Sequence, residues 1–319
     1  MIAAAWLLAA LAPIVIPDGV ADPGATTAVF ARAPGIEAVD LRTGKPLWHS
    51  AAADAPLIVH GNTLYARARD PNAPNRLRVL AFDLRKGTLR ATSPPVELPA
   101  FVDVRAAPSA SGCHPFFVTW PRIHEDRLVL AWSASSGWMS GVPPPPGAVK
   151  GDRGLIRFDA ALTTFDMAPW DDAAVMIAAP AAPPIRFAVE PRGAQQAVVL
   201  HPDGQPERVL VEQQTITQAY RTPDGRLIVV VAGGWSVLFA ADDGRFVARL
   251  PHNVGTIAVV GRSLIVADTA RPTSVLRGCT PRTLRVVETS KGRALWTRPL
   301  PPRDSTPLSF VLAPRVSLA

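Results

Sequence analysis

IEAVDLRTGKPLW, at residues 36–48, contains the pattern that decides the fold. An apolar strand leads to Asp40, a turn follows around Gly44, and a second strand ends at Trp48. Glycine adopts a positive φ in a tight hairpin because it has no Cβ to clash. An aspartate just before such a turn accepts hydrogen bonds from nearby backbone amides. The stretch therefore predicts a β-hairpin.

The same pattern returns five more times, as VLAFDLRKGTLRA, VLAWSASSGWMSG, AVVLHPDGQPERV, SVLFAADDGRFVA and LRVVETSKGRALW. Its turn glycines are Gly44, Gly87, Gly137, Gly204, Gly244 and Gly292, at separations of 43, 50, 67, 40 and 48 residues. A period of about 40–50 residues is typical of β-propellers, in which each repeat forms one blade. The separation of 67 residues is long for one repeat and short for two. We therefore expect a degenerate unit at 151–190, around LIRFDAALTTF.

The order of the strands predicts how the ring closes. TTAVFAR, IEAVDL and PLWH supply only the second, third and fourth strands of the first blade. We expect TPLSFVL, at residues 306–312, to supply the missing first strand and so remove the open sheet edges. Trp48 and Trp296 end their repeats as large apolar side chains, which we expect to pack between neighbouring blades.

These patterns predict an all-β protein with a single β-propeller at residues 22–319. Without residues 1–21, 298 residues remain, and seven four-stranded blades of about 43 residues match the repeat length of such propellers. Six and eight blades are the alternatives, six if residues 143–195 are only an insertion. The 34 prolines, spread along the chain, suit many short strands and disfavour long helices.

The phrase AVDLRTGKPLW resembles the PQQ-like (quinoprotein-like) propeller repeat, in which a similar phrase closes a blade, and GNTLYAR at 61–67 resembles the strand before it. The resemblance covers about two thirds of the chain and is weakest at 143–195. It implies the propeller fold. Family members that are dehydrogenases bind PQQ and calcium, but this chain is far shorter and has no adjacent cysteine pair. We therefore expect no PQQ and no other cofactor.

The N-terminal residues predict export. Residues 2–16 are apolar apart from Pro13, and the small-x-small site Gly19-Val20-Ala21 follows. This pattern is typical of a signal peptide, here residues 1–21, although no Lys or Arg precedes the apolar run. The alternative is an N-terminal strand or a frayed arm. We expect an extracytoplasmic protein, periplasmic or secreted, that meets a membrane only through an uncleaved leader.

Two cysteines, Cys113 and Cys279, would be free to pair in an exported protein. The repeat places Cys113 in a loop of the third blade and Cys279 in a loop of the last blade, on opposite faces of the ring. A disulfide needs Cα atoms within about 7 Å. We therefore expect two thiols rather than a bridge.

Catalytic motifs are scarce. A metal-dependent propeller hydrolase or lyase, with a site at the central channel, is the alternative function. Its candidate residues are His114, His124, Glu125, Asp126, Asp171 and Asp172. The histidines lack the H-x-H or H-x-x-x-H spacing of metal sites, and no phosphate-binding loop or nucleophile elbow occurs. The sequence assigns no catalytic residue, and we expect no metal site.

The remaining features favour a binding module. The net charge is +7, but the arginines are scattered singly, which does not favour nucleic acid as the partner. We expect Trp120, Trp132, Trp138 and Trp235 in the core between blades, and Pro143–Pro146 as a stiff surface loop. The predicted function is a non-enzymatic, monomeric propeller that binds a protein through loops 70–76, 108–115, 139–153 and 269–282.

Overall fold

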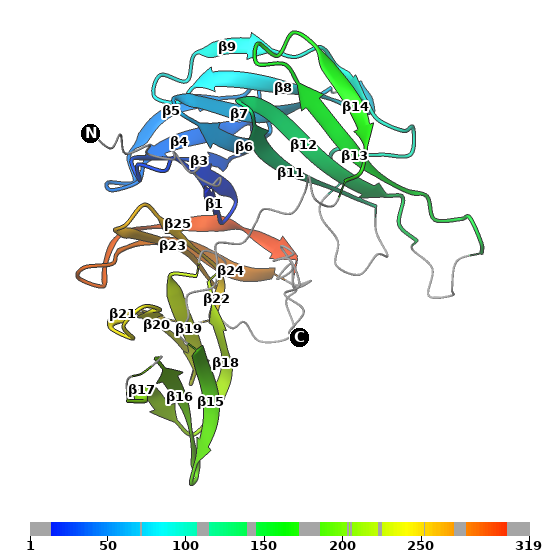
Figure 1. Cartoon of the computed structure of the whole chain (residues 1–319). Coiled ribbons are helices and arrows are strands. Elements are labelled where there is room, and N and C mark those ends of the chain that lie inside the picture. Colours follow the sequence, from blue (N-terminus) through cyan, green and yellow to red (C-terminus); the bar gives the residue numbers. More distant parts are fainter. Residues whose placement is uncertain are drawn as a thin grey trace, which may run out of the picture.

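The computed structural model describes residues 14–70, 72–106, 115–138, 145–171, 186–202, 204, 206–222, 225–251, 253–270 and 279–304. These residues form six antiparallel sheets, which we number in chain order (Figure 1). Sheet 1 consists of β1 (Ile14–Ile16), β2 (Gly19–Ala21), β3 (Thr27–Ala31), β4 (Ile36–Asp40) and β5 (Pro46–Ser50). Sheet 2 consists of β6 (Ala55–His60), β7 (Thr63–Asp70), β8 (Ala73–Asp83), β9 (Leu89–Thr92) and β10 (Val96–Glu97).

Sheet 3 consists of β11 (Phe116–His124), β12 (Arg127–Ser135), β13 (Gly151–Phe158) and β14 (Phe165–Pro169). Sheet 4 consists of β15 (Arg186–Arg192), β16 (Gln195–His201) and β17 (Arg208–Gln213). Sheet 5 consists of β18 (Ile216–Arg221), β19 (Leu227–Ala232), β20 (Trp235–Ala240) and β21 (Phe246–Pro251). Sheet 6 consists of β22 (Asn253–Val260), β23 (Leu264–Ala270), β24 (Cys279–Glu288) and β25 (Arg293–Asp304).

The sheets pack face to face in an arc, with the N-terminal sheet 1 beside the C-terminal sheet 6 (Figure 1). Among the described residues, five hydrophobic clusters lie between neighbouring sheets and run from sheet 4 through 5, 6, 1 and 2 to sheet 3. Alternating inward-facing residues of consecutive meanders bury each other in this way in a β-propeller. The predicted all-β propeller fold is therefore confirmed.

Each sheet has two distinct ends. Because neighbouring strands are antiparallel, connections alternate between a turn end (β2–β3, β4–β5, β6–β7, β8–β9) and a loop end (β3–β4, β5–β6, β7–β8). Contacts between sheets join like ends. The Arg42 guanidinium donates to Ser263 Oγ across sheets 1 and 6 at 3.2 Å. His60 Nε2 lies 3.3 Å from Asp126 Oδ1 across sheets 2 and 3. The turn ends therefore form one face of the arc and the loop ends the other.

Two tryptophans join neighbouring sheets, as predicted. Trp48, on β5, donates from Nε1 to the carbonyl of Leu84 in sheet 2 at 2.8 Å. Trp296, on β25, donates in the same way to the carbonyl of Leu41 in sheet 1 at 2.7 Å. Each ring covers the turn glycine of the sheet that receives it, and a Cβ on Gly87 would lie 2.5 Å from the Trp48 ring. At Gly44 and Gly87 the hairpin turn thus provides a docking site for an aromatic ring.

Substituting this glycine tests the docking site. Gly87→Ala is expected to destabilise the protein by about 1–3 kcal/mol more than Gly61→Ala, because overpacking against Trp48 adds to backbone strain. The two positions share a positive φ, +69° and +56°, but no atom lies within 4 Å of a Cβ on Gly61. Urea denaturation of both variants measures the difference. Equal losses of stability would show that the ring contact contributes nothing.

The degenerate unit predicted at 151–190 is wrong. Strands β13 and β14 pair with β12 and complete sheet 3 instead of starting a new blade. Their hairpin turns at Asp159–Leu162 without a glycine: Leu162 adopts a φ of 58°, and its amide donates to the Asp159 carbonyl at 3.1 Å. Gly137, counted as a turn glycine of the repeat, lies in the connection between β12 and β13. The described residues thus account for six sheets, the lower of the predicted alternatives.

The first strand of sheet 1 was also assigned incorrectly. The position beside β3 is occupied by β2, through the pairs Gly19–Phe30, Val20–Val29 and Ala21–Ala28. Residues 306–312, which were predicted to fill it, lie outside the described residues, as do Cys113 and residues 1–13. Cys279, placed in a loop, is the first residue of β24.

Candidate binding site

A group of ion pairs, built around two largely buried carboxylates, lies at the loop end of sheets 1, 2 and 6. The Glu37 side chain is 3% exposed and forms ion pairs with Arg32 of sheet 1 and Arg298 of sheet 6. The Arg298 guanidinium also lies 6.0 Å from the centre of the Phe30 ring. A buried carboxylate is tolerated only where such partners satisfy it. Glu37 therefore ties the N-terminal sheet to the C-terminal sheet.

A second carboxylate lies one sheet further along. Asp54, in the connection between β5 and β6, accepts hydrogen bonds at Oδ2 from Arg67 Nη2 at 2.8 Å and Arg67 Nε at 3.2 Å. Arg69 Nε is 3.5 Å from the same oxygen. Asp54 Oδ1 is buried and has no hydrogen-bond partner among the described residues. One carboxylate oxygen thus accepts from arginine, and the other is enclosed by the protein without a hydrogen-bond partner.

Between these charges is a pocket of about 280 Å³, which we call the loop-end pocket. The turn Ala31–Gly35 forms one wall, and Asp54 and Arg69 form the other. Two polar contacts fix the wall formed by the turn. The Arg32 amide donates to the Gly35 carbonyl at 2.8 Å, and His49 Nε2 is 2.8 Å from the Pro34 carbonyl oxygen. The lining combines two guanidinium groups, one carboxylate and small apolar side chains, which is a set suited to recognition rather than to covalent chemistry.

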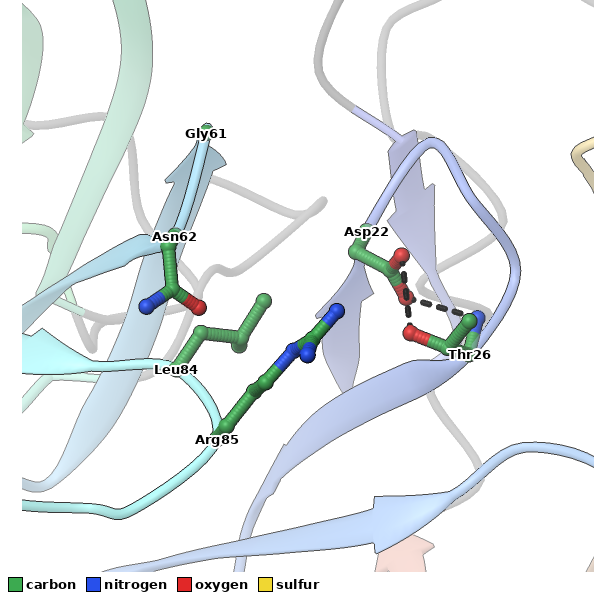
Figure 2. Close-up of a pocket in the computed structure, with 6 residues that line it drawn as sticks. All are labelled: Asp22, Thr26, Gly61, Asn62, Leu84 and Arg85. Carbon is green, nitrogen blue, oxygen red and sulfur yellow. Dashed lines mark hydrogen bonds between the residues drawn. The ribbon is translucent and has the colours of Figure 1, made fainter.

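A larger pocket, of about 390 Å³, lies at the turn end of sheets 1 and 2. Its lining residues are Asp22, Thr26, Gly61, Asn62, Leu84 and Arg85 (Figure 2). Asp22 is committed to its own turn, since it accepts hydrogen bonds from the Thr26 amide at 2.8 Å and the Thr26 hydroxyl at 3.1 Å. Arg85 points towards it from the opposite side. This pocket provides a matched control for experiments on the loop-end pocket.

The structure separates the residues predicted for a hydrolase. Glu125 and Asp126 form the hairpin turn between β11 and β12, with φ values of 49° and 58°. His124 Nε2 lies 3.9 Å from Glu125 Oε1. Asp171 follows β14 and therefore lies at the opposite, loop end of the same sheet. His114 and Asp172 lie outside the described residues. The described candidates are thus not brought to a common site.

Within the described ranges, no group of three or more His, Cys, Asp or Glu side chains could hold a metal ion. Nor does the described part of the chain contain a helix long and apolar enough to cross a membrane.

The predicted tryptophans and loops have mixed outcomes. Trp132 is buried in the core between sheets 2 and 3, as expected. Trp235 is 40% exposed, so its assignment to the core is wrong. Trp120 contacts Trp170 edge to face, with 5.6 Å between ring centres.

The predicted recognition loops include residues that the structure places in strands. Residues 73–76 belong to β8, and residues 279–282 belong to β24. Residues 108–114, 139–144 and 271–278 lie outside the described residues.

Sequence reasoning missed the residues of the loop-end pocket. Glu37, which pairs with the lining residue Arg32, is a charge within an apolar strand, and the sequence offers no other signal for it. Its partner Arg298 is 261 residues away. No local spacing predicts that pair, because it depends on the first and last sheets lying side by side.

Two carboxylates in hairpin turns, Asp83 and Asp159, have lowered pKa values because turn amides donate hydrogen bonds to them. Amide donation from Lys86 lowers the pKa of Asp83, aided by the Arg90 side chain and opposed by burial. Amide donation from Thr164 and the Thr163 hydroxyl lower the pKa of Asp159. The predicted role of an aspartate before the turn glycine is confirmed at Asp83, whose Oδ1 accepts amide hydrogens from Arg85 and Lys86 at 2.9 Å.

These shifts predict acid sensitivity. A pKa below its unfolded value near 3.8 means that the stabilisation is present above that pH and is lost as pH falls through the lowered folded value. Asp83→Asn is therefore expected to reduce the decline of unfolding free energy between pH 5 and pH 2.5. Urea titrations at several pH values measure this slope, with Glu125→Gln as an exposed control. An unchanged slope in Asp83→Asn would contradict the assignment.

Comparison with known proteins assigns the chain to no family. No family model matches the chain, and no curated protein matches it. Solved structures with a similar shape include Hsv2p of Kluyveromyces lactis, at 12% identity over 91% of this chain and 98% of that one, with a TM-score of 0.32. The WD40 domain of SCAP from fission yeast has 8% identity over 86% and 60%, with a TM-score of 0.25. At these values the likenesses carry no inference about function.

Proposed function

We propose that this chain is a non-enzymatic, extracytoplasmic β-propeller that binds a partner protein at its loop end. The observation that carries the proposal is the loop-end pocket. Charged groups of both signs line it, the packing of sheets 1, 2 and 6 fixes their positions, and the longer connections leave the same face. Binding residues are commonly placed on loops and rims that a rigid scaffold positions.

The propeller is proposed to be of the PQQ-like repeat type, without PQQ. The phrase AVDLRTGKPLW and the docking of Trp48 on the next turn glycine support this. Export through an N-terminal leader is proposed from the apolar run. Because β1 and β2 are part of sheet 1, we place any cleavage before Ile14, since a cut after Ala21 would remove both strands.

Affinity capture with matched variants tests the binding site. The full chain, Arg69→Ala and Arg85→Ala are each immobilised and exposed to a periplasmic or secreted fraction of the native host. Arg69 lies at the loop end and Arg85 at the turn end. A partner retained by the full chain and by Arg85→Ala, but lost with Arg69→Ala, is the expected result. If the partner is lost only with Arg85→Ala, the binding site lies at the turn end and the proposed location is wrong.

A further inference from the structure

The turn end of sheets 6, 1 and 2 carries a group of basic side chains, which we call the turn-end patch. Its members are exposed and come from four turns: Arg42, Lys45, Arg85, Lys86, Arg262 and Arg293. The turns are neighbours, since a Cβ on Gly44 or Gly87 would touch the tryptophan of the adjacent sheet and Arg42 reaches Ser263. Within the part of the chain that the structure describes, none of the six forms an ion pair.

The loop end of the same sheets is arranged differently. There the buried carboxylates Glu37, Asp54 and Asp268 pair with arginines. At the turn end, Asp40 and Asp83 instead accept hydrogen bonds from the backbone amides of their own turns. With Arg90 and Lys291 included, eight cations share this end with four carboxylates, which are Asp22, Asp40, Asp83 and Glu288. An excess of fixed positive charge attracts an anionic surface.

Two exposed leucines adjoin these cations. Leu47 and Leu89 are 47% and 52% exposed, and each follows the turn of its sheet at the start of the outer strand. Basic side chains beside exposed aliphatic ones are typical of surfaces that lie on an anionic bilayer. A single-stranded nucleic acid would favour aromatic rings free to stack on bases, whereas Trp48 and Trp296 are engaged with the turns of neighbouring sheets. The combination therefore favours lipid.

The N-terminal strand begins at this same end. Ile14, the first residue of β1, pairs with Ala21, which directly precedes the β2–β3 turn. In the sequence, residues 2–12 before this strand are all apolar. A leader retained in a bilayer would therefore join the propeller beside the turn-end patch, and the patch would face the lipid.

We propose that the turn-end patch binds the surface of an anionic phospholipid bilayer. Its guanidinium and ammonium groups contact the lipid phosphates, and Leu47 and Leu89 enter the headgroup region. The inference goes beyond the proposed function, because protein binding is assigned to the loop end, which then faces away from the membrane. The cations are scattered singly in the sequence and gather only when three sheets bring their turns together.

Vesicle binding tests the proposal directly. The full chain is mixed with vesicles of phosphatidylcholine and with vesicles that also contain phosphatidylglycerol, and the bound fraction is measured by flotation. At low salt, binding to the anionic vesicles is expected to be at least about tenfold tighter. Salt at about 0.5 M should remove the difference by screening. An apolar leader would raise binding to both vesicles alike, so equal binding to the two, or to neither, would overturn the proposal.

Matched variants locate the contact. Each basic residue near an anionic bilayer strengthens binding about fivefold, so Lys45→Gln with Lys86→Gln should weaken binding to the anionic vesicles at least tenfold. Lys150→Gln with Arg192→Gln removes the same charge from exposed residues at the loop end and should change binding less than twofold. Thermal melts show that both variants are folded. Equal weakening by the two pairs would mean that net charge, and not the patch, determines binding.

A further pair of variants separates lipid from other anions. Leu47→Ser with Leu89→Ser should weaken binding to the anionic vesicles at least threefold while leaving the charge unchanged. A short single-stranded DNA is titrated in parallel. If the DNA binds more tightly than the vesicles and Lys45→Gln with Lys86→Gln abolishes that binding, the patch is a nucleic-acid site and the proposal is wrong. Partner capture through Arg69 should be unaffected by these substitutions, so the two proposals fail separately.

Discussion

Removal of residues 1–21 is expected to unfold most of the protein at 37 °C, in comparison with a chain that begins at Ile14. The longer deletion takes away β1 and β2, where Ile16, Val20 and Ala21 are at most 3% exposed. It also exposes the edge of β3 and removes Asp18, whose carboxylate is 3.2 Å from the buried Arg282. Each large aliphatic side chain contributes about 1.5–3 kcal/mol when buried. The total loss, about 5 kcal/mol, is comparable to the whole stability of many domains.

Thermal and urea denaturation of chains 14–319 and 22–319 measure this difference. At about 2–4 °C per kcal/mol for domains of 150–250 residues, the longer deletion should lower Tm by at least 10 °C. The experiment also bears on export, because a leader cleaved after Ala21 would produce the same unstable chain. If chain 22–319 is as stable as chain 14–319, then β1 and β2 are dispensable for folding. Cleavage after Ala21 would then again be the expected processing site.

The repeat made the architecture predictable because the residues that define each hairpin lie close together in the sequence. Asp40, Gly44 and Trp48 lie within nine residues, and each has a role that backbone geometry dictates: amide acceptor, positive φ, and docking ring. The same rule failed at sheet 3, where Asp159 and Leu162 make the hairpin without a glycine. The search for Gly-centred turns then selected Gly137, in a connection, and shifted the count of units.

The binding site was not predictable for the opposite reason. Glu37 and Arg298 meet only because sheets 1 and 6 are neighbours, and Asp54 meets Arg67 only through the register of β6 and β7. Burial of a carboxylate is a property of the assembled sheets, so a sequence pattern cannot distinguish Glu37 from a solvated glutamate. The N-terminal strands β1 and β2 were missed for another reason. An apolar run of their length is equally typical of a signal peptide.

Trp296→Ala is expected to open the arc at the junction of sheets 6 and 1. Trp296 covers Gly44 and donates to the Leu41 carbonyl, so truncation leaves a cavity and an unpaired carbonyl. Replacing a packed tryptophan with alanine costs about 3–5 kcal/mol. Trp48→Ala removes the equivalent contact between sheets 1 and 2, but there the short β5–β6 connection still holds the sheets together. Sheets 6 and 1 have no such connection, because they are formed by opposite ends of the chain.

The two variants should therefore lose similar stability but differ in shape. Small-angle X-ray scattering at 20 °C is expected to show a larger radius of gyration for Trp296→Ala than for Trp48→Ala. Trp235→Ala, at an exposed tryptophan, serves as the control and should change stability by less than about 1 kcal/mol. Trp296→Phe keeps a ring over Gly44 but cannot donate to Leu41, so it should fall between the full chain and Trp296→Ala. Equal radii for Trp296→Ala and Trp48→Ala would mean that Glu37, Arg298 and the surrounding core hold the junction without the tryptophan.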